Sequence, residues 1–401
     1  MTTLRILTLN CWGIPIPVVC KNRCDRIEAI GDEISKRDYH LVILEEVWLS
    51  SDYKILCEKI CPVLPHAHYF YSGMLGTGCC VFSKFPIGET MYFHFSLNGF
   101  AHKVWHADWY AGKGVGLCKM VIDGLHINLY SSHIHAEYNR ANDEYLSHRI
   151  AQCFEMSQFI KQTSGTCDLV ILAGDLNMLP SDLGYRVILT NGNLQDCWTD
   201  KEKTTSDEAG NTCELPDNSY TSAEDTKVNP LGKRIDYILY RANQGVKVFI
   251  KEASVTMGCI PGKHFHYSDH EALEAVLRIE KSSDVVSPLE DDDHLESERN
   301  QHLLEAIEFI DIGMEQSKFN GMFFQFGFLL LFILLFLLSQ TEAGGDPMIF
   351  YILLFVKLGL TLVLAFCFWT GVMVTRTDAN NFLGIKLNIA NVLKNSKVKI
   401  Q

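Results

Sequence analysis

The sequence predicts an α/β domain, with helices packed on β-sheets, followed by two membrane-spanning helices. Over residues 1–280, short apolar runs alternate with helix-length amphipathic stretches and clusters of turn residues. An acidic segment follows, and two long segments after it carry almost no charge. Because an apolar sheet face must be covered, the mixed pattern of the first part favours sheets flanked by helices.

The predicted strands are short apolar runs, and the predicted helices have amphipathic spacing. The strands are residues 4–9, 41–44, 79–82, 115–121, 127–131, 169–173, 235–240 and 272–279. The helices are residues 22–37 and 139–162. We expect Asn139 to cap the second helix, because acidic residues at 143 and 144 follow in its first turn.

Net charge and cysteine usage exclude two classes of protein. The formal net charge of −13 argues against a general nucleic-acid binder, because phosphate-backbone affinity comes mainly from clustered Lys and Arg. The 14 cysteines show no paired CxxC spacing of a zinc site, so we expect buried, reduced thiols. The first residues lead directly into a strand without a signal-peptide pattern, which predicts a cytosolic main domain.

Two C-terminal segments are long enough to cross a bilayer, which takes about 20 apolar residues. Residues 321–339 carry no charge, and residues 348–374 carry only Lys357. The connection 340–346 has no Lys or Arg, whereas the tail is basic, so the positive-inside rule places the tail in the cytosol. With two spans, both termini are then cytosolic, and we expect the endoplasmic reticulum or the plasma membrane. The expected organisation is a catalytic domain 1–280, an acidic linker and juxtamembrane segment 281–318 with a helix at 303–314, a hairpin 319–375 and a tail 376–401.

Lys357 is the misfit in the second span. A charge near mid-span costs roughly 3 kcal/mol on insertion scales, so it should pair with a polar group. We expect that partner to be Gln325 or a lipid head group.

Polar residues stand at the ends of six predicted strands. The run 169–173 stops at Gly174, and Asp175 and Asn177 then point to the same face. Alone, such a pair is more often a turn than a site. Active sites on sheets gather at strand ends, however, and several such ends favour a site. The other polar ends contain Asn10, Glu45, Glu46, His133, His135, Arg234, Asp236, Ser268, Asp269 and His270.

Each of these strand ends also has a plainer interpretation. Only one of Glu45 and Glu46 can face a site, because successive strand residues point to opposite faces. His133 and His135 with Glu137 would suit zinc or simply line a surface rim. Asp236 would serve equally as an ion-pair partner of the nearby Arg234.

As an ordered set, these motifs resemble the metal-dependent phosphodiesterases that include deoxyribonuclease I, abasic-site endonucleases and inositol-polyphosphate phosphatases. The resemblance covers residues 4–280. Within that superfamily the chain is most similar to the neutral sphingomyelinases with a C-terminal pair of membrane spans, on residues 12–15, 133–140 and 268–273. The resemblance implies a four-layer α/β/β/α sandwich, with two sheets face to face and helices outside.

The resemblance also implies a metal and a base. Glu46, helped by Asn10, would bind Mg²⁺, which prefers one or two carboxylates together with water and phosphate oxygens. His270 would take a proton from the attacking water, and Asp236 would hold its ring in the right tautomer.

The remaining roles concern the phosphate. Asp175 and Asn177 would orient the water and the phosphoryl oxygens, and Asp269 and His133 would stabilise the transition state or assist the leaving oxygen. Asn177 and His133 would therefore also contact substrate, and the general acid stays unassigned. Glu45 departs from the Gln that is usual in this superfamily, and its charge would strengthen metal binding or raise a neighbouring pKa.

Two features would contribute to substrate binding. Asp108 and Lys113 resemble an acid–lysine pair that couples a mobile loop to the site in related sphingomyelinases, although an ordinary loop charge pair is equally expected. Trp48, Trp105 and Trp109 would suit a choline head group, with core packing as the default for each.

The resemblance and the anchor together imply Mg²⁺-dependent hydrolysis of sphingomyelin to ceramide and phosphocholine on the cytosolic side, without nucleic-acid binding. One alternative is a lyso-phospholipase C acting on lysophosphatidylcholine or lyso-platelet-activating factor. The other is a non-enzymatic, membrane-tethered binding module.

Overall fold

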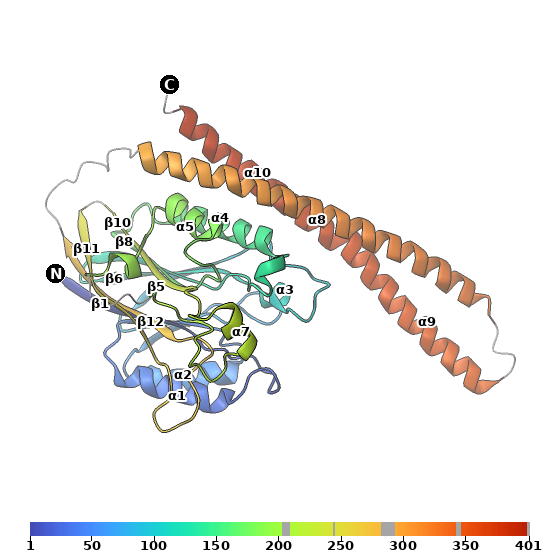
Figure 1. The fold of residues 1–401 in the computed structure, drawn as a ribbon, viewed down its shortest axis with the longest axis horizontal. Helices are drawn as coiled ribbons and strands as arrows, with labels where there is room; N and C mark the ends of the chain where they lie inside the picture. The colour runs from blue at the N-terminus through green and yellow to red at the C-terminus, as the bar shows by residue number, and fades with distance from the viewer. Residues whose placement is uncertain (203–208, 244, 282–292, 342–345, 399–401) are drawn as a thin grey trace.

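The catalytic region is a four-layer sandwich, as expected. The computed structural model describes residues 1–202, 209–243, 245–281, 293–341 and 346–398 (Figure 1). Two six-stranded sheets pack face to face, and helices cover both outer faces. Residues 282–292 of the expected linker, which include four of its acidic residues, lie outside the described residues.

The first sheet has the order β11-β12-β1-β2-β4-β3. Its strands are β1 (Thr2–Asn10), β2 (Leu41–Glu45), β3 (His66–Tyr69), β4 (Cys80–Ser83), β11 (Val246–Thr256) and β12 (Ala272–Lys281). β1 and β2 are parallel, and the other pairs are antiparallel. The side-chain alternation of β1 explains the layers, because Leu4 and Ile6 face the second sheet while Leu7 and Leu9 face the helices.

The second sheet has the order β5-β6-β7-β8-β10-β9. Its strands are β5 (Ile87–His94), β6 (Gly114–Ile122), β7 (Leu125–Ser132), β8 (Leu169–Asp175), β9 (Gln195–Asp196) and β10 (Asp236–Ala242). Only β7 and β8 pair in parallel among its described strands. β8 is buried along its whole length, as its unbroken apolar run predicts.

Four longer helices cover the sheets. α1 (Arg23–Lys36) and α2 (Ser50–Ile60) pack on the first sheet, and α4 (Leu146–Thr163) and α5 (Leu183–Gly192) pack on the second. The short helices are α3 (Asp108–Ala111), η1 (Arg140–Asn142), α6 (Cys197–Asp200) and α7 (Ala223–Val228).

All eight predicted strands are present, but the second predicted helix is not continuous. Asn139 caps the 3₁₀ turn η1 through the N–H groups of Ala141 and Asn142, and α4 starts only at Leu146. β5 was not predicted because its exposed face carries mixed residues, and among the described strands it pairs with β6 alone. All 14 cysteines are free, as expected, but only nine of them are buried, and Cys24 and Cys259 are exposed.

The C-terminal part consists of long helices that form a hairpin. They are α8 (Asp293–Ser339), α9 (Pro347–Phe368), the π-helical η2 (Trp369–Val374) and α10 (Thr375–Val398). Two apolar windows with mean hydropathy 2.5 make these helices long and apolar enough to cross a membrane, and 6% and 0% of those windows are buried. The expected helix at 303–314 is not separate, because α8 runs through it without a break.

The ends of this hairpin dock on the catalytic domain. Leu303 and Ile310 of α8 and Phe382 of α10 pack with Phe154 of α4 in one buried cluster. Residues 376–398, expected as a basic tail, are therefore mainly a packed helix. Gln325, a suggested partner of Lys357, instead donates to the backbone oxygen of Gly371 at 2.8 Å.

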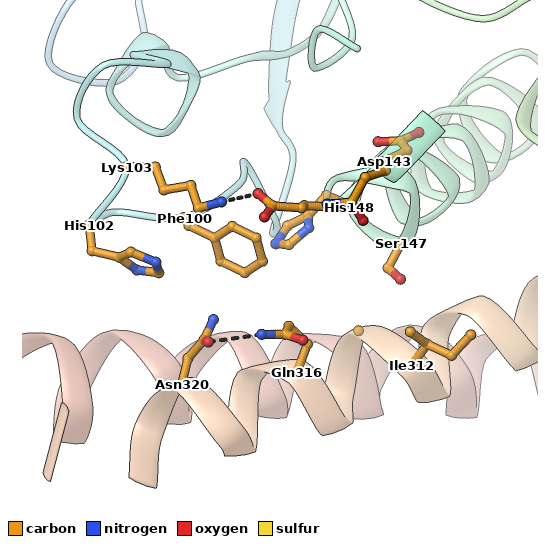
Figure 2. Close-up of a pocket in the computed structure, with 12 residues that line it drawn as sticks. Phe100, His102, Lys103, Asp143, Ser147, His148, Ile312, Gln316 and Asn320 are labelled. Carbon is orange, nitrogen blue, oxygen red and sulfur yellow. Dashed lines mark hydrogen bonds and ion pairs between the residues drawn. The ribbon is translucent and has the colours of Figure 1, made fainter. Parts of the chain in front are cut away.

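A cavity of about 430 Å³ lies between α8 and the catalytic domain (Figure 2). Gln316 and Asn320 line it from α8, and Phe100, Lys103 and His148 line it from the domain. Lys103 forms an ion pair with Glu144, so the positive charge of this lysine is already neutralised.

Candidate active site

The polar strand ends of the two sheets meet at one end of the sandwich. Asn10 ends β1 in the first sheet, and Asp175 ends β8 in the second. The side-chain amide of Asn10 donates to Asp175 Oδ2 at 3.0 Å and to Glu46 Oε1 at 3.1 Å. Three residues that are far apart in sequence are thus held in one buried cluster.

Gly174 makes room for this cluster. Its φ is 144°, and a Cβ placed there would lie 1.9 Å from the backbone oxygen of Ser132. Asp175 then accepts from the backbone N–H of Asn177 at 2.9 Å through Oδ1, which is the turn that its sequence favours. Asp175 therefore closes the turn with Oδ1, while its Oδ2 faces Asn10 and belongs to the polar cluster. Asn177 donates to the backbone oxygen of Ile134 at 3.1 Å.

His270 lies between two carboxylates. Its Nδ1 donates to Asp236 Oδ2 at 2.9 Å, and its Nε2 lies 4.0 Å from Asp175 Oδ2. The Asp236 interpretation as an ion-pair partner of Arg234 does not hold, because Arg234 pairs with Asp196 at 2.5 Å. The structure therefore brings Asp236, His270 and Asp175 together as the resemblance implies.

Asp269 and Ser268 border the same cluster. Ser268 Oγ donates to the backbone oxygen of Asn10 at 2.6 Å and lies 3.1 Å from Asp269 Oδ1. This bond ties the segment before β12 to the end of β1. Asp269 is half-buried beside the site.

A metal ion fits this donor set. One ligand atom each from Asp175, Asp236 and His270 lies within 4.8 Å of the others, and Asp236 Oδ1 is buried without a hydrogen-bond partner among the described residues. Glu46, with Trp48 Nε1 at 3.4 Å, faces the site, whereas Glu45 is buried beneath it against Thr8. Asn10 Oδ1 accepts from the backbone of Trp12 at 3.0 Å, so its nitrogen faces the carboxylates. Metal ligation by Glu46 and Asn10 stays a prediction.

The titration of these groups reflects crowded negative charge. Burial raises the pKa of Glu46, and so does the nearby Asp269. Burial together with Asp236 raises the pKa of Asp175 to about 7. Burial lowers the pKa of His270, but Cys213 and Asp236 outweigh it and raise the value well above the ordinary one. Buried acids that resist ionisation are suited to a bound cation.

His133 faces Asp175 from the other side. Its Nε2 lies 3.5 Å from Asp175 Oδ2 and accepts from Lys113 Nζ at 3.1 Å. Burial and then Lys113 lower its pKa well below the ordinary value, so the ring is neutral. His133 is therefore placed as an uncharged group beside the central carboxylate.

Lys113 and Asp108 form a buried ion pair of 2.5 Å. Lys113 also donates to the backbone oxygen of Ile134 at 2.8 Å, and the Tyr138 hydroxyl donates to Asp108. Burial raises the pKa of Asp108, but Lys113 outweighs it and the net shift is downward. With side chains only 3% and 6% exposed, this is no ordinary surface loop pair.

The zinc alternative is not supported. Among the described residues, the group of side chains that could hold a metal ion is Asp175, Asp236 and His270, and it does not include His133, His135 or Glu137. The three tryptophans suggested for a choline head group lie in different surroundings. Trp48 borders Glu46, Trp109 packs on Trp369, and Trp105 is 93% exposed.

Two contributors were not found from sequence. Thr212 Oγ1 donates to Asp236 Oδ2 at 2.5 Å. Arg26 of α1 donates to the backbone oxygens of Cys11 and Trp12 at 2.7 Å each, which fixes the loop after Asn10. Thr212 lies in a polar stretch without periodicity, and Arg26 looks like any polar residue of an amphipathic helix, so neither carried a signal.

Known proteins share both the sequence and the fold. The endonuclease/exonuclease/phosphatase family matches residues 7–270. Human sphingomyelin phosphodiesterase 2 is 41% identical over 345 residues, which cover 85% of this chain and 80% of the relative. A putative neutral sphingomyelinase of Drosophila melanogaster is 38% identical and covers 90% and 91% of the two chains.

Solved structures share the fold at lower identity. The crystal structure of SmcL superposes with a TM-score of 0.52 at 18% identity, covering 69% of this chain and 99% of that one.

The inositol phosphosphingolipids phospholipase C of Schizosaccharomyces pombe is a more distant sequence relative, 32% identical over 69% of this chain and 68% of its own. The polar strand ends, the sandwich and these matches together show that the chain belongs to the endonuclease/exonuclease/phosphatase family, in the branch of the neutral sphingomyelinases.

Proposed function

We propose that this protein hydrolyses the phosphodiester of sphingomyelin to ceramide and phosphocholine, in a Mg²⁺-dependent reaction at the cytosolic face of a membrane. The observation that carries the proposal is the His270–Asp236 pair, in which His270 Nε2 lies 4.0 Å from Asp175 Oδ2. The same chain has two helices that are long and apolar enough to cross a membrane. The relatives named for sphingomyelin cleavage support the substrate class.

The chain's own residues divide the chemistry. Asp236 accepts from Nδ1 of His270, which leaves Nε2 to take a proton from an attacking water. The water oxygen bonds to phosphorus as the bond from phosphorus to the ceramide oxygen breaks, and that oxygen gains a proton. Asn177 and His133 would stabilise the phosphate charge that develops, through hydrogen bonds.

A divalent cation suits the crowded carboxylates. Glu46, helped by Asn10, would hold it beside Asp175, because Mg²⁺ takes one or two carboxylates and completes its shell with water and phosphate oxygens. Bound there, the ion supplies Lewis-acid stabilisation of phosphoryl charge and offsets the acids that raise the pKa of His270.

The docked helices support the membrane arrangement. α8 enters the apolar hairpin from the catalytic domain, and α10 leaves it and packs back along α8 (Figure 1). If α8 and α9 span, the catalytic domain and the C-terminus lie on one face. The connection 340–346 has no Lys or Arg, and by the positive-inside rule this would place that face in the cytosol. Tethering also raises the effective concentration of the domain at the lipid.

A substrate panel tests the activity. The full chain in mixed micelles should release phosphocholine from sphingomyelin with Mg²⁺ and lose this activity in chelator. Faster Mg²⁺-dependent cleavage of lysophosphatidylcholine or lyso-platelet-activating factor would assign the lyso-lipid alternative. Binding without cleavage of any of the three would assign the binding-module alternative.

Topology is tested separately. A tag after residue 401 should be digested by protease added outside sealed vesicles whose cytosolic face is outward. Protection of that tag, while a tag in the 340–346 connection is cleaved, would overturn the cytosolic assignment.

A further inference from the structure

Two loops of the catalytic domain expose apolar side chains next to the hairpin. We name residues 71–75 and 104–105 the rim loops. Their large exposed side chains are Tyr71 (74%), Met74 (74%), Leu75 (46%), Val104 (47%) and Trp105 (93%). A soluble surface seldom gathers so much exposed apolar area at one place, which indicates an interaction site.

The rim loops form one surface. The backbone N–H groups of Met74 and Leu75 donate to the oxygen of Tyr110 at 3.2 and 3.1 Å. Gly73 and Gly112 approach so closely that a Cβ on Gly73 would lie 2.6 Å from the Cα of Gly112. Residues 71–75 are therefore fixed to the end of α3, which begins three residues after Trp105.

The same surface adjoins the level at which the hairpin becomes apolar. The ring of Trp109 in α3 lies 5.6 Å from that of Trp369, and the ring of His102 lies 5.0 Å from that of Phe324. Phe324 and Trp369 stand at the domain-side ends of the two apolar segments, where Gln325 bonds to Gly371. In Figure 1, α3 lies at the end of the sandwich from which the hairpin projects.

We infer that the rim loops insert into the interfacial region of the lipid bilayer, as a third membrane contact beside the two spans. Exposed Trp and Tyr are the residues that favour this region. The bilayer is favoured over a second copy of the chain because α3, to which the rim loops are fixed, contacts Trp369 at the domain-side end of the apolar hairpin. This inference rests on the proposed membrane embedding and deepens the proposed function.

Insertion would set the site against its substrate. The loop 71–75 leads to Gly78, whose oxygen accepts from the N–H of Val47 at 2.8 Å, directly after Glu46. The other loop leads through α3 to Lys113, which contacts His133. Seating the rim in the interface would hold the segments that lead to Glu46 and His133 close to the lipid head groups.

Photocrosslinking tests the contact without using activity. The photoreactive residue p-benzoylphenylalanine replaces Trp105 in the full chain, reconstituted into phosphatidylcholine vesicles. The matched control carries it at Val121, which is 54% exposed near the Thr2–Asp123 bond at the opposite end of the sandwich. Lipid adducts should exceed those of the control by at least about fivefold. Equal adducts at both positions, or a crosslinked dimer in place of lipid, would overturn the inference.

A kinetic comparison tests the consequence. Met74→Ser/Leu75→Ser should cleave sphingomyelin in vesicles about fivefold more slowly, yet cleave a short-chain, monomeric sphingomyelin at the normal rate. Val121→Ser should change neither rate. An equal loss on both substrates would contradict an interfacial role. If the unsubstituted chain cleaved neither substrate, the proposed activity would fail while the crosslinking result still stood.

Discussion

His270–Asp236 and Lys113–Asp108 are two buried charge pairs at the same end of the sandwich, but their surroundings differ. His270 Nε2 faces Asp175 at 4.0 Å, and Asp236 Oδ1 has no hydrogen-bond partner among the described residues. Lys113 and Asp108 have further bonds to Ile134 and Tyr138. The first pair keeps free hydrogen-bonding capacity for water, metal or substrate, whereas the second is satisfied and braces His133.

The sharpest way to test this contrast is to remove the first pair's ring. His270→Ala should lower phosphocholine release by on the order of 10²–10⁴-fold, because the proton acceptor is lost. Circular dichroism should show an intact fold, since the packed cores do not include this side chain. His126→Ala, at an exposed histidine on β7, is the matched control and should keep full activity. Near-normal turnover of the His270 variant would remove it from the proposed mechanism.

Breaking the second pair should act mainly on stability. Asp108→Asn leaves Lys113 buried without its carboxylate, which costs about 3–5 kcal/mol of folding free energy. Thermal unfolding in detergent measures the loss. The double variant Asp108→Asn/Lys113→Met should recover part of it, because no unpaired charge remains. Equal stability of the Asp108 variant and the parent would show that the pair is not a brace.

A smaller change probes one bond of the brace. Tyr138→Phe removes the hydroxyl that donates to Asp108 and should cost about 1 kcal/mol, because a buried acceptor loses one of several partners. The midpoint of thermal unfolding is the measurement. Tyr71→Phe, at a 74% exposed ring, should leave the midpoint unchanged. A loss as large as that of Asp108→Asn would mean that the hydroxyl, and not Lys113, carries the brace.

The weakest effect comes from Glu155, a carboxylate with no ion-pair partner in the part of the chain that the structure describes. Burial raises the pKa of Glu155 to about 7, although it accepts from the backbone N–H of Ser96 at 3.1 Å. Because the pKa of Glu155 is higher in the folded than in the unfolded state, this group contributes most to stability at a pH below the unfolded-state pKa. That contribution is lost as the pH rises through 7, where the buried carboxyl must ionise. Glu155→Gln should therefore raise the unfolding temperature relative to the parent at pH 8 but not at pH 4.5. The same difference at both pH values would show that its charge is not responsible.

Local patterns in the sequence were sufficient for much of the fold and site. Buried strands such as β8 are continuous apolar runs, and their ends carry the polar residues that build the site. The turn at Asp175 follows from a short-range hydrogen bond to Asn177, whereas the glycine at 174 is required by the backbone of Ser132 on the neighbouring strand. The two apolar segments could be found by length and composition alone, because hydrocarbon needs about 20 residues to cross.

Tertiary structure decided which of these groups meet. Asn10 joins Glu46 and Asp175 only because two sheets pack face to face, and no spacing in the sequence encodes that distance. It also decided that Arg234 pairs with Asp196, that Thr212 serves Asp236, and that the basic tail folds back as α10. These outcomes depend on contacts between residues distant along the chain, whereas a pattern in the sequence reports only what neighbouring residues favour.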